Sequence, residues 1–363
     1  MPWTPMSRHD PLQLQECFSR NEGLGCDLQP KARLKSWVGN RFNRIRLAKS
    51  LFPLPTLIPL FPVLEPNIRP AGHGQPPVDV DSMPDIEELM HRTLDVCADE
   101  KSVSPAVRAA HYHLTCGGQR IRARIAATSA LALDLPVSDA VVLAAAAELI
   151  HNASLVHDDV VDREEYRRGS KTVVAAYGST IAICTGDLLL SAAYAVVGNL
   201  SCGGQIPVLL RSIFRAASVA IHGQCREFAL APKSAEMWQD YESIAKAKSG
   251  ALLALPLELV LGAAGKIECI PVARKCAEAF AVAYQIVDDI DDLSKDRGDG
   301  VGPSSYNALL ILEAEGHVDS ALAIASQLAK NRLLESIELA GSLPNQSGRL
   351  LASLAKEMLG QIP

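Results

Sequence analysis

The feature that most constrains this chain is a long apolar segment over residues 140–156. Ala, Val, Leu and Ile fill almost every position of this segment. Its few polar residues are Glu148, His151, Asn152 and Ser154. Ser138 and Asp139, which precede it, are typical N-cap residues. Because a helix that is apolar on every side is buried by other elements all round, the segment predicts the central helix of a helical protein.

The rest of the chain supports a helical fold class. A second long helix is predicted over residues 272–293, with Pro271 at its start and polar residues in its last third. Aromatic residues make up 5% of the chain, and neither strand alternation nor an internal repeat is present. We therefore expect an all-α protein, a large helical bundle. Further helices are predicted near residues 85–98, 104–115, 180–199, 206–228, 236–262, 304–316 and 317–340.

The first 82 residues differ from the remainder. They contain a basic stretch over residues 31–49 without an acidic residue, followed by an apolar segment that four prolines interrupt. Two interpretations are open: an organelle-targeting presequence, or an accessory extension that has no catalytic role. Acidic residues before the basic stretch favour the extension, so we predict an extension over 1–82, one domain over 83–363 and a cytoplasmic location, with organelle targeting as the alternative.

Charge, hydropathy and cysteine spacing exclude several functional classes. The net charge of −6 gives no basic surplus, so we expect no nucleic-acid partner. No run of about 18 uninterrupted apolar residues is present, which predicts no transmembrane segment. The nine cysteines include no CxxC pair, and this is typical of unpaired thiols in a reducing compartment.

Two clusters of aspartates carry the functional prediction. The first is Asp158, Asp159 and Asp162 in LVHDDVVD, and the second is Asp288, Asp289, Asp291 and Asp292 in YQIVDDIDD. Positions i and i+4 share one face of a helix, so Asp158 with Asp162 and Asp288 with Asp292 would each direct two carboxylates to one point.

Each cluster alone could be a solvated helix end. Both clusters, however, follow long apolar helices, where close carboxylates repel and require a compensating cation. Oxygen ligands select hard cations, and Mg²⁺ in particular bridges carboxylates to substrate phosphates. The pair of clusters therefore predicts a magnesium-dependent diphosphate site.

Basic residues near glycines would complete such a site. Arg167 and Arg168 follow the first cluster and precede Gly169. Other basic groups follow Gly117–Gly118 or precede Ser249 and Gly250, namely Arg120, Arg122, Arg124, Lys246 and Lys248. Guanidinium groups bind phosphate in a bidentate way, although each of these residues alone could be an exposed surface charge.

These motifs, over residues 84–300, resemble the polyprenyl synthetase family, the trans-isoprenyl diphosphate synthases. HDDVVD with the following RRGSKTV, and YQIVDDIDD, are similar to the two aspartate-rich motifs of that family. GGQRIR, IHNASL, GQCRE and KSG are similar to further family motifs and occur in the family order. The resemblance implies an all-α bundle around a deep apolar pocket, normally in a homodimer. It also implies an enzyme that joins an allylic diphosphate to isopentenyl diphosphate.

The resemblance also implies individual roles. It assigns Asp158, Asp159, Asp162, Asp288, Asp289 and Asp292 to three Mg²⁺ ions that hold the allylic diphosphate. Arg167, Lys248, Ser249 and Gln285 would contact the same diphosphate, and Gln119, Arg122, His151 and Arg168 would hold isopentenyl diphosphate. Asp158, Asp162, Arg167, Arg168, Lys248 and Asp288 would be the catalytic set. His151 could equally be a hydrogen-bonded core histidine.

Two small residues one turn before the first cluster suggest a long product. These are Ala153 and Ser154, where short-product members of the family are similar in placing an aromatic residue. One turn of helix is about 5.4 Å, near the length of an isoprene unit, so a large side chain there would act as a floor. Without one we expect a product of C20 or longer, as in longer-chain members.

Three departures from the family pattern leave alternatives open. Gln119 replaces a lysine, the segment after Asp292 lacks the usual GK element, and the C-terminus lacks a basic ending. A weakly active or inactive partner subunit of a synthase is therefore one alternative. A class I terpene cyclase is another, although Arg167–Arg168 and the GGxRxR element disfavour it.

Overall fold

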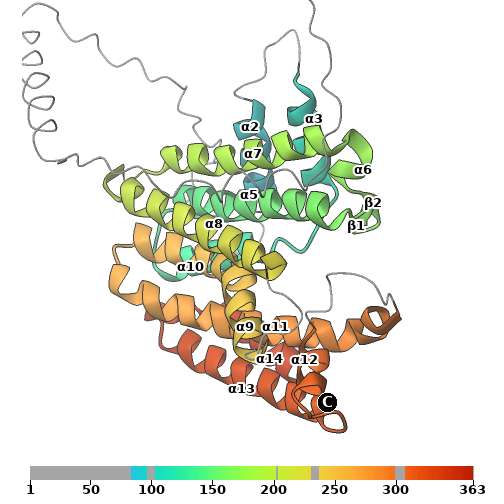
Figure 1. Ribbon diagram of the computed structural model, residues 1–363. Coiled ribbons are helices and arrows are strands. Elements are labelled where there is room, and N and C mark those ends of the chain that lie inside the picture. Colours follow the sequence, from blue (N-terminus) through green and yellow to red (C-terminus); the bar gives the residue numbers. More distant parts are fainter. Residues whose placement is uncertain (1–82, 96–102, 202, 230–236, 299–306, 363) are drawn as a thin grey trace, which may run out of the picture. The chain divides into compact units, whose positions relative to one another are not determined.

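The computed structural model describes residues 83–95, 103–201, 203–229, 237–298 and 307–362. The predicted extension over residues 1–82 lies outside these ranges and stays a prediction. The described part is almost entirely helical (Figure 1), which confirms the predicted fold class. Its α-helices are α2 (Met83–Asp95), α3 (Pro105–Thr115), α4 (Ile121–Ala132), α5 (Val137–Asp162), α6 (Val173–Tyr177), α7 (Ser179–Val196), α8 (Ile206–Ala229), α9 (Met237–Ala245), α10 (Ala251–Ala263), α11 (Ile270–Gly298), α12 (Ala308–Ala314), α13 (Ala321–Gly341) and α14 (Arg349–Leu359).

Shorter elements connect these helices. A π-helical segment, η5 (Lys246–Gly250), joins α9 to α10 without a break. Four 3₁₀ turns lie elsewhere, at η3 (Val197–Asn199), η4 (Gly203–Gln205), η6 (Ile267–Cys269) and η7 (Pro344–Gln346). One two-stranded antiparallel hairpin, β1 (Tyr166–Arg167) and β2 (Ser170–Lys171), follows α5.

The central apolar segment forms α5, as predicted, but the helix starts earlier than expected. Its N-cap is Pro136, and Asp139 lies within the first turn. The predicted capping role of Ser138 and Asp139 is therefore wrong. The buried Asp139 carboxylate instead accepts hydrogen bonds from the backbone N–H of Ser201 (2.9 Å) and from its hydroxyl (2.6 Å), which ties the segment after α7 to α5.

The apolar core has two parts, and α10 contributes to both. One part surrounds α5 and includes side chains of α2, α4 and α7, and the other surrounds α11 and includes side chains of α13 and α14. Every residue of α10 is buried. Leu255 and Leu259 pack in the α5 part, whereas Leu257 and Leu261 pack in the α11 part. The helix therefore separates and joins the two parts.

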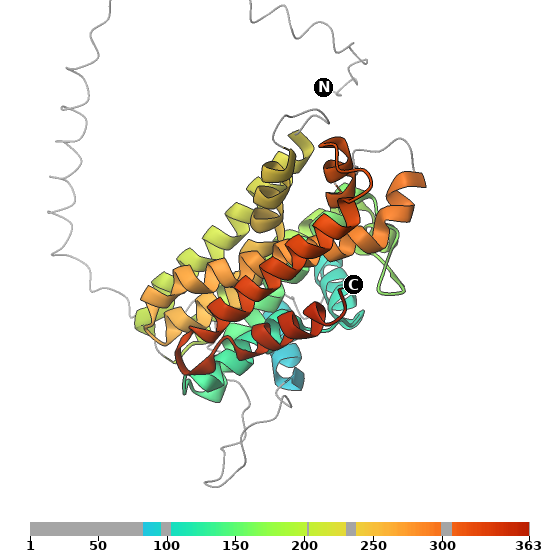
Figure 2. The same cartoon turned by 90° about the horizontal axis from the view of Figure 1, so that it is seen from below.

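The two helices that carry the aspartate clusters have their carboxyl ends on the same side of the domain. Figures 1 and 2 show both ends near the side on which the β1–β2 hairpin lies. Arg163 ends α5 in the left-handed conformation (φ 58°), and its N–H donates to the carbonyl of Asp159. The first cluster thus occupies the last turns of α5, whereas the second precedes the end of α11.

Among the residues that the structure describes, three helical stretches are long and apolar enough to cross a membrane by length and composition, although none is an uninterrupted apolar run. They are Val137–Asp162, Ser179–Asn199 and Gly203–Ala229. In the first of them, 78% of the apolar window is buried inside the protein. For α5, a position between other helices accounts for the apolar sequence, and length and composition alone do not make this chain a membrane protein.

Candidate active site

The three aspartates of the first cluster have different surroundings. Asp158 is half-buried, and its pKa is raised, chiefly by burial, although Lys248 nearby acts in the opposite direction. Asp162 is exposed one turn later. Asp159 is fully buried and accepts a hydrogen bond at Oδ1 from Arg167 Nε (2.7 Å), while its Oδ2 is buried without a hydrogen bond. Asp158 and Asp162 are therefore the pair that faces outward.

The second cluster divides in the same way. Asp288 is exposed and Asp292 is half-buried, whereas Asp289 is buried. Asp289 accepts hydrogen bonds from the Tyr241 hydroxyl (2.7 Å), Gln285 Nε2 (2.9 Å) and the Ala308 N–H (2.8 Å). Burial raises the pKa of Asp289 to about 6 even though these three donors act in the opposite direction. Its carboxylate joins α9, α11 and the start of α12.

The β1–β2 hairpin positions the two arginines that follow the first cluster. Its turn consists of Arg168 (φ 54°) and Gly169 (φ 76°), and two successive positive φ values are typical of tight two-residue hairpins. The guanidinium of Arg168 donates to the carbonyl of Gly117. It also lies where a Cβ on Gly118 would be, and the φ of Gly118 (131°) is one that residues with a side chain rarely adopt, so this position favours glycine. The hairpin thus places the guanidinium of Arg168 against Gly117 and Gly118.

A cavity of about 280 Å³ begins beside Asp158 and continues between apolar side chains. Ala153 and Ser154 line it, together with Ile150 one turn earlier and Leu190 of α7. We call it the tail cavity. Its other lining residues include Ala217, Ala220, Ile221, Gln224 and Cys225 of α8 and Leu252 of α10. Its apolar wall suits a hydrocarbon tail, and Lys248, which also lines it, suits an anionic head together with a cation held by Asp158.

A second cavity, of about 970 Å³, lies beside the first. Arg120, Arg122, Arg167 and Arg168 line it, and we call it the arginine cavity. Its wall also contains Gln119, Phe280 and Tyr284, and residues Leu354, Glu357, Met358 and Gln361 from α14 and the residues after it. Several guanidinium groups around one space suit a multivalent anion.

Four residues line both cavities, so the two cavities adjoin at these residues. They are Arg122, His151, Leu155 and Ser249. The pKa of His151 is lowered, chiefly by burial and then by the charge of Arg122, so its imidazole is neutral near pH 7. Its Nδ1 and the Nε of Arg122 are buried without a hydrogen-bond partner in the described part of the chain. Both residues therefore have hydrogen-bonding capacity available toward a ligand.

The π-helical segment η5 places Lys248 and Ser249 at the cavities. Lys248 lines the tail cavity, and its Nζ donates to Glu227 Oε2 of α8 (2.7 Å). A Cβ on Gly223 of α8 would approach the backbone nitrogen of Lys248 to 2.8 Å, so glycine permits this close packing. An extra residue per turn, as in a π-helix, is frequent at functional sites.

Some predicted site residues do not line either cavity. These are Asp159, Asp162, Gln285, Asp288, Asp289 and Asp292. Within the described ranges no group of three or more His, Cys, Asp or Glu side chains converges in the way a protein-only metal cage requires. The outward pairs Asp158–Asp162 and Asp288–Asp292 are oxygen-only donors, which fit Mg²⁺ held jointly by carboxylates and phosphate oxygens.

Sequence reasoning missed part of the arginine cavity. Helix α14 was not predicted, although Leu350, Leu351, Leu354 and Met358 have helical spacing. The buried Glu148 was noted only as an interruption in an apolar helix, yet it also lines this cavity. A carboxylate in an otherwise apolar helix is itself a signal, because a buried charge requires a partner.

Comparisons with known proteins identify relatives of this chain. The family model described as Polyprenyl synthetase matches residues 104–301. The chain is 30% identical over 215 residues to a geranylgeranyl pyrophosphate synthase of Geoglobus acetivorans, over 58% of this chain and 66% of that protein. It is 30% identical over 221 residues to a probable farnesyl diphosphate synthase of Bradyrhizobium diazoefficiens, over the same shares. The matched region thus spans just under two thirds of these relatives.

Solved structures have the same fold. The crystal structure of heptaprenyl diphosphate synthase from Staphylococcus aureus superposes with a TM-score of 0.64 at 20% identity, and covers 79% of this chain and 100% of that one. The match of the family model covers more than half of the chain, including GGQRIR and both aspartate clusters. This chain therefore belongs to the polyprenyl synthetase family.

Proposed function

We propose that this protein is a trans-prenyltransferase that condenses an allylic diphosphate with isopentenyl diphosphate. One observation carries the proposal: the tail cavity and the arginine cavity adjoin, since Arg122, His151, Leu155 and Ser249 line both. Two anionic substrates bound in adjoining cavities would have their reactive carbons close together. The names of the related synthases support the same reaction class.

The allylic substrate fits the tail cavity. Its diphosphate would lie at the end that Asp158 and Lys248 line, and its hydrocarbon would extend past Ala153 and Ser154. We propose that the aspartates of the two clusters hold this diphosphate through Mg²⁺, with three ions as in the family pattern. Asp159 and Asp289 are buried and hydrogen-bonded within the protein, so they would orient the helices while Asp158, Asp162, Asp288 and Asp292 face the ions.

Isopentenyl diphosphate fits the arginine cavity. Arg122 and Arg168 offer charged donors to a diphosphate, and the neutral His151 offers an uncharged N–H. Arg167 also lines this cavity, although the resemblance assigns it to the allylic diphosphate. Because Arg167 donates to Asp159 on α5, it would connect the two head-group sites.

The reaction proceeds without a dedicated protein base. Bound Mg²⁺ supplies the positive charge that stabilises the departing diphosphate. The allylic C–O bond breaks and its electron pair leaves with the diphosphate, giving an allylic cation that the apolar wall of the tail cavity protects from water. The isopentenyl double bond then forms the new C–C bond, and a proton passes from the adjacent carbon to the released diphosphate. Lys248 would stabilise that leaving group.

A weakly active or inactive partner subunit is the second candidate, and Gln119 favours it. This exposed side chain lines the arginine cavity where the family pattern has a lysine, so the cavity has one cation fewer. A terpene cyclase would need no second diphosphate site, so the presence of the arginine cavity disfavours that alternative.

The deciding experiment incubates the purified full chain with Mg²⁺, labelled isopentenyl diphosphate and each allylic diphosphate in turn. A synthase gives prenyl diphosphates only when both substrates are present, a cyclase gives hydrocarbons from the allylic substrate alone, and an inert subunit gives neither. Asp158→Asn should lower kcat by at least about a thousandfold, whereas Asp291→Asn, which changes an exposed aspartate outside the i, i+4 pairs, should retain turnover. Normal turnover of Asp158→Asn would contradict the proposal.

A further inference from the structure

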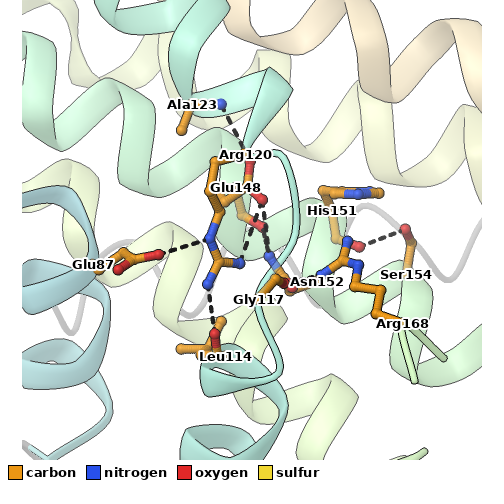
Figure 3. A network of polar contacts seen from close by, with 10 residues as sticks. All are labelled: Glu87, Leu114, Gly117, Arg120, Ala123, Glu148, His151, Asn152, Ser154 and Arg168. Atoms are coloured by element: carbon orange, nitrogen blue, oxygen red, sulfur yellow. Dashed lines mark hydrogen bonds and ion pairs between the residues drawn. The ribbon is translucent and has the colours of Figure 1, made fainter. Parts of the chain in front are cut away.

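Arg120 and Glu148 are two buried charged residues in the wall of the arginine cavity, and the proposed reaction assigns neither a role. They are 7% and 1% exposed, respectively, and Figure 3 shows their contacts. Arg120 Nη1 lies 3.7 Å from Glu148 Oε1. A buried ion pair of this kind needs further hydrogen bonds to offset the desolvation of its charges, so the partners of each residue indicate what the pair does.

Glu148 caps a helix to which it does not belong. The N-cap residue of α4 is Arg120, whose side chain makes no capping hydrogen bond. The N–H of Ala123, in the first turn of α4, donates instead to Glu148 Oε2 of α5 (3.2 Å). A carboxylate at a helix N-terminus satisfies an unpaired N–H and stabilises the helix dipole. The first turn of α4, which carries Arg122, is thereby fixed to α5.

Asn152 orients this cap. Its Nδ2 donates both to the carbonyl of Glu148 (2.8 Å) and to Glu148 Oε1 (3.3 Å). Asn152 lies one turn after Glu148 on the same helix and is itself buried. The carboxylate therefore has contacts on both oxygens.

Arg120 directly follows the segment 116–119, which we call the glycine loop, and anchors its end to neighbouring helices. Its Nε donates to Glu87 Oε1 of α2 (3.0 Å), and its Nη2 donates to the carbonyl of Leu114 near the end of α3 (2.5 Å). Its backbone is left-handed (φ 50°), a conformation that costs roughly 1 kcal/mol or more for a residue with a side chain. One guanidinium group thus joins α2, α3 and α5 at the end of the glycine loop.

Arg168 contacts the same glycine loop. Its guanidinium donates to the carbonyl of Gly117 and packs against Gly118, as Figure 3 shows for Gly117. Arg168 is therefore positioned by the loop that Arg120 anchors, and Arg122 by the helix turn that Glu148 caps. Two of the guanidinium groups that line the arginine cavity, those of Arg122 and Arg168, thus depend on one buried pair.

The negative charge of Glu148 also acts on Arg122 and Arg168. The pKa values of Arg122 and Arg168 are lowered, chiefly by burial, and the negative charge of Glu148 acts in the opposite direction on both. The charge of Arg120 adds to the lowering at Arg168. Glu148 thus offsets repulsion among guanidinium groups that have been brought close together.

We infer that Arg120 and Glu148 are positioning residues that hold Arg122 and Arg168 in place to bind one diphosphate group in the arginine cavity. The inference rests on the proposed function for the identity of that diphosphate, isopentenyl diphosphate. Neither residue needs to touch the substrate. Their effect reaches it through the first turn of α4 and through the glycine loop.

The test is substrate-specific kinetics of Glu148→Gln and Arg120→Lys in the full chain. Both changes keep the approximate size of the side chain, and each should raise KM for isopentenyl diphosphate about tenfold, as is usual when a supporting hydrogen bond is removed. The KM for the allylic diphosphate should change less than about twofold, because the tail cavity has other contacts. In the double variant the two effects should be clearly less than additive, since the residues act as a unit.

Glu258→Gln is the matched control. Glu258 is a fully buried carboxylate that bonds two arginines, Arg215 and Arg274, and it lines neither cavity. Its loss should lower the unfolding midpoint without a selective change in either KM. An equal rise of both KM values in Glu148→Gln, or a lower unfolding midpoint with both KM values unchanged, would overturn the inference.

Two further measurements cover failure to fold and failure of the proposed function. Glu87→Gln changes the 46% exposed partner of Arg120 and should raise KM for isopentenyl diphosphate about threefold. Calorimetric titration with inorganic pyrophosphate in the absence of Mg²⁺ needs no turnover, and Glu148→Gln should bind it about tenfold more weakly than the wild type. If the wild type makes no product, the proposed function fails, whereas equal pyrophosphate binding by wild type and variant overturns this inference.

Discussion

Asp158 and Asp159 are neighbours in the chain, yet only Asp158 lines a cavity. The helix rotates by about 100° between them, since it has 3.6 residues per turn, so Asp159 points into the protein and pairs with Arg167. Asp288 and Asp289 differ in the same way. In both motifs one aspartate of the pair is accessible to a ligand, and the other holds the helix and its neighbours in position.

The buried His113 should make the free energy of unfolding depend on pH. It is 5% exposed, and burial, together with the nearby charge of Arg168, lowers its pKa from 6.5 to about 4. The unfolded chain therefore binds a proton at this histidine below about pH 6.5 while the folded chain does not. Stability should fall as the pH drops from about 6.5 to about 4, by up to roughly 3 kcal/mol from this residue.

Chemical denaturation at several pH values checks this prediction. His113→Asn should flatten the pH dependence of the unfolding free energy between about pH 6.5 and pH 4. The matched variant His317→Asn changes an exposed histidine and should leave the pH dependence as in the wild type. Parallel curves for wild type and His113→Asn would show that His113 does not contribute.

At the scale of elements, the helices could be predicted and their interruptions could not. The apolar segment and the aspartate motifs located α5 and α11, because a long buried helix has an unmistakable composition. The π-helical turn at Lys246–Gly250 was hidden inside a predicted helix over 236–262, since its sequence has ordinary helical residues. The hairpin that turns Arg168 toward Gly117 was missed because two residues per strand leave no alternation pattern.

The same limit applies to the site. The residues that line the cavities, such as Arg122, His151 and Lys248, were found from short motifs. The contributions of Glu148 and of α14 to the arginine cavity were not predicted, because they depend on which helices pack together. Buried ion pairs such as Glu148 with Arg120 join residues 28 positions apart, and spacing in one sequence does not reveal them.

The wall of the tail cavity leads to a prediction on product length. Ala153 is buried and lines the cavity with Ser154. Ala153→Phe adds a ring where the hydrocarbon would extend, so the main product should be shorter by at least one isoprene unit, given a helical turn of about 5.4 Å. Chromatography of the dephosphorylated products measures this. Ala195→Phe on α7, an exposed position outside the cavity, should leave the product unchanged. An unchanged product from Ala153→Phe would refute Ala153 as the upper wall.

At the scale of the whole molecule, α10 joins two apolar cores, and the proposed reaction takes place between them. Helix α8 lines the tail cavity and also presents exposed apolar side chains. Phe214, Ile221 and Phe228 are 66%, 60% and 53% exposed and repeat every seven residues, so they form one stripe along the helix. Ile221 also lines the tail cavity. An exposed apolar stripe of this kind suits a self-complementary contact.

We therefore propose that two copies associate through α8, in agreement with the homodimer expected from the family pattern. Phe214→Glu should shift the purified protein from dimer to monomer and weaken association by at least about a hundredfold, since it places a charge in the centre of an apolar contact. Light scattering coupled to size exclusion measures the mass. Leu334→Glu on α13, which is 53% exposed, is the matched control and should remain dimeric. A monomeric wild type would contradict the proposal.

The proposed function depends above all on joint binding of metal and a diphosphate by the aspartates of α5 and α11. The most direct measurement is anomalous diffraction from crystals grown with Mn²⁺ and inorganic pyrophosphate, because Mn²⁺ accepts the same oxygen ligands as Mg²⁺. We expect anomalous peaks beside Asp158 and Asp162 and beside Asp288, all of them in contact with the same pyrophosphate. Peaks on one helix only, or pyrophosphate bound away from both, would contradict it.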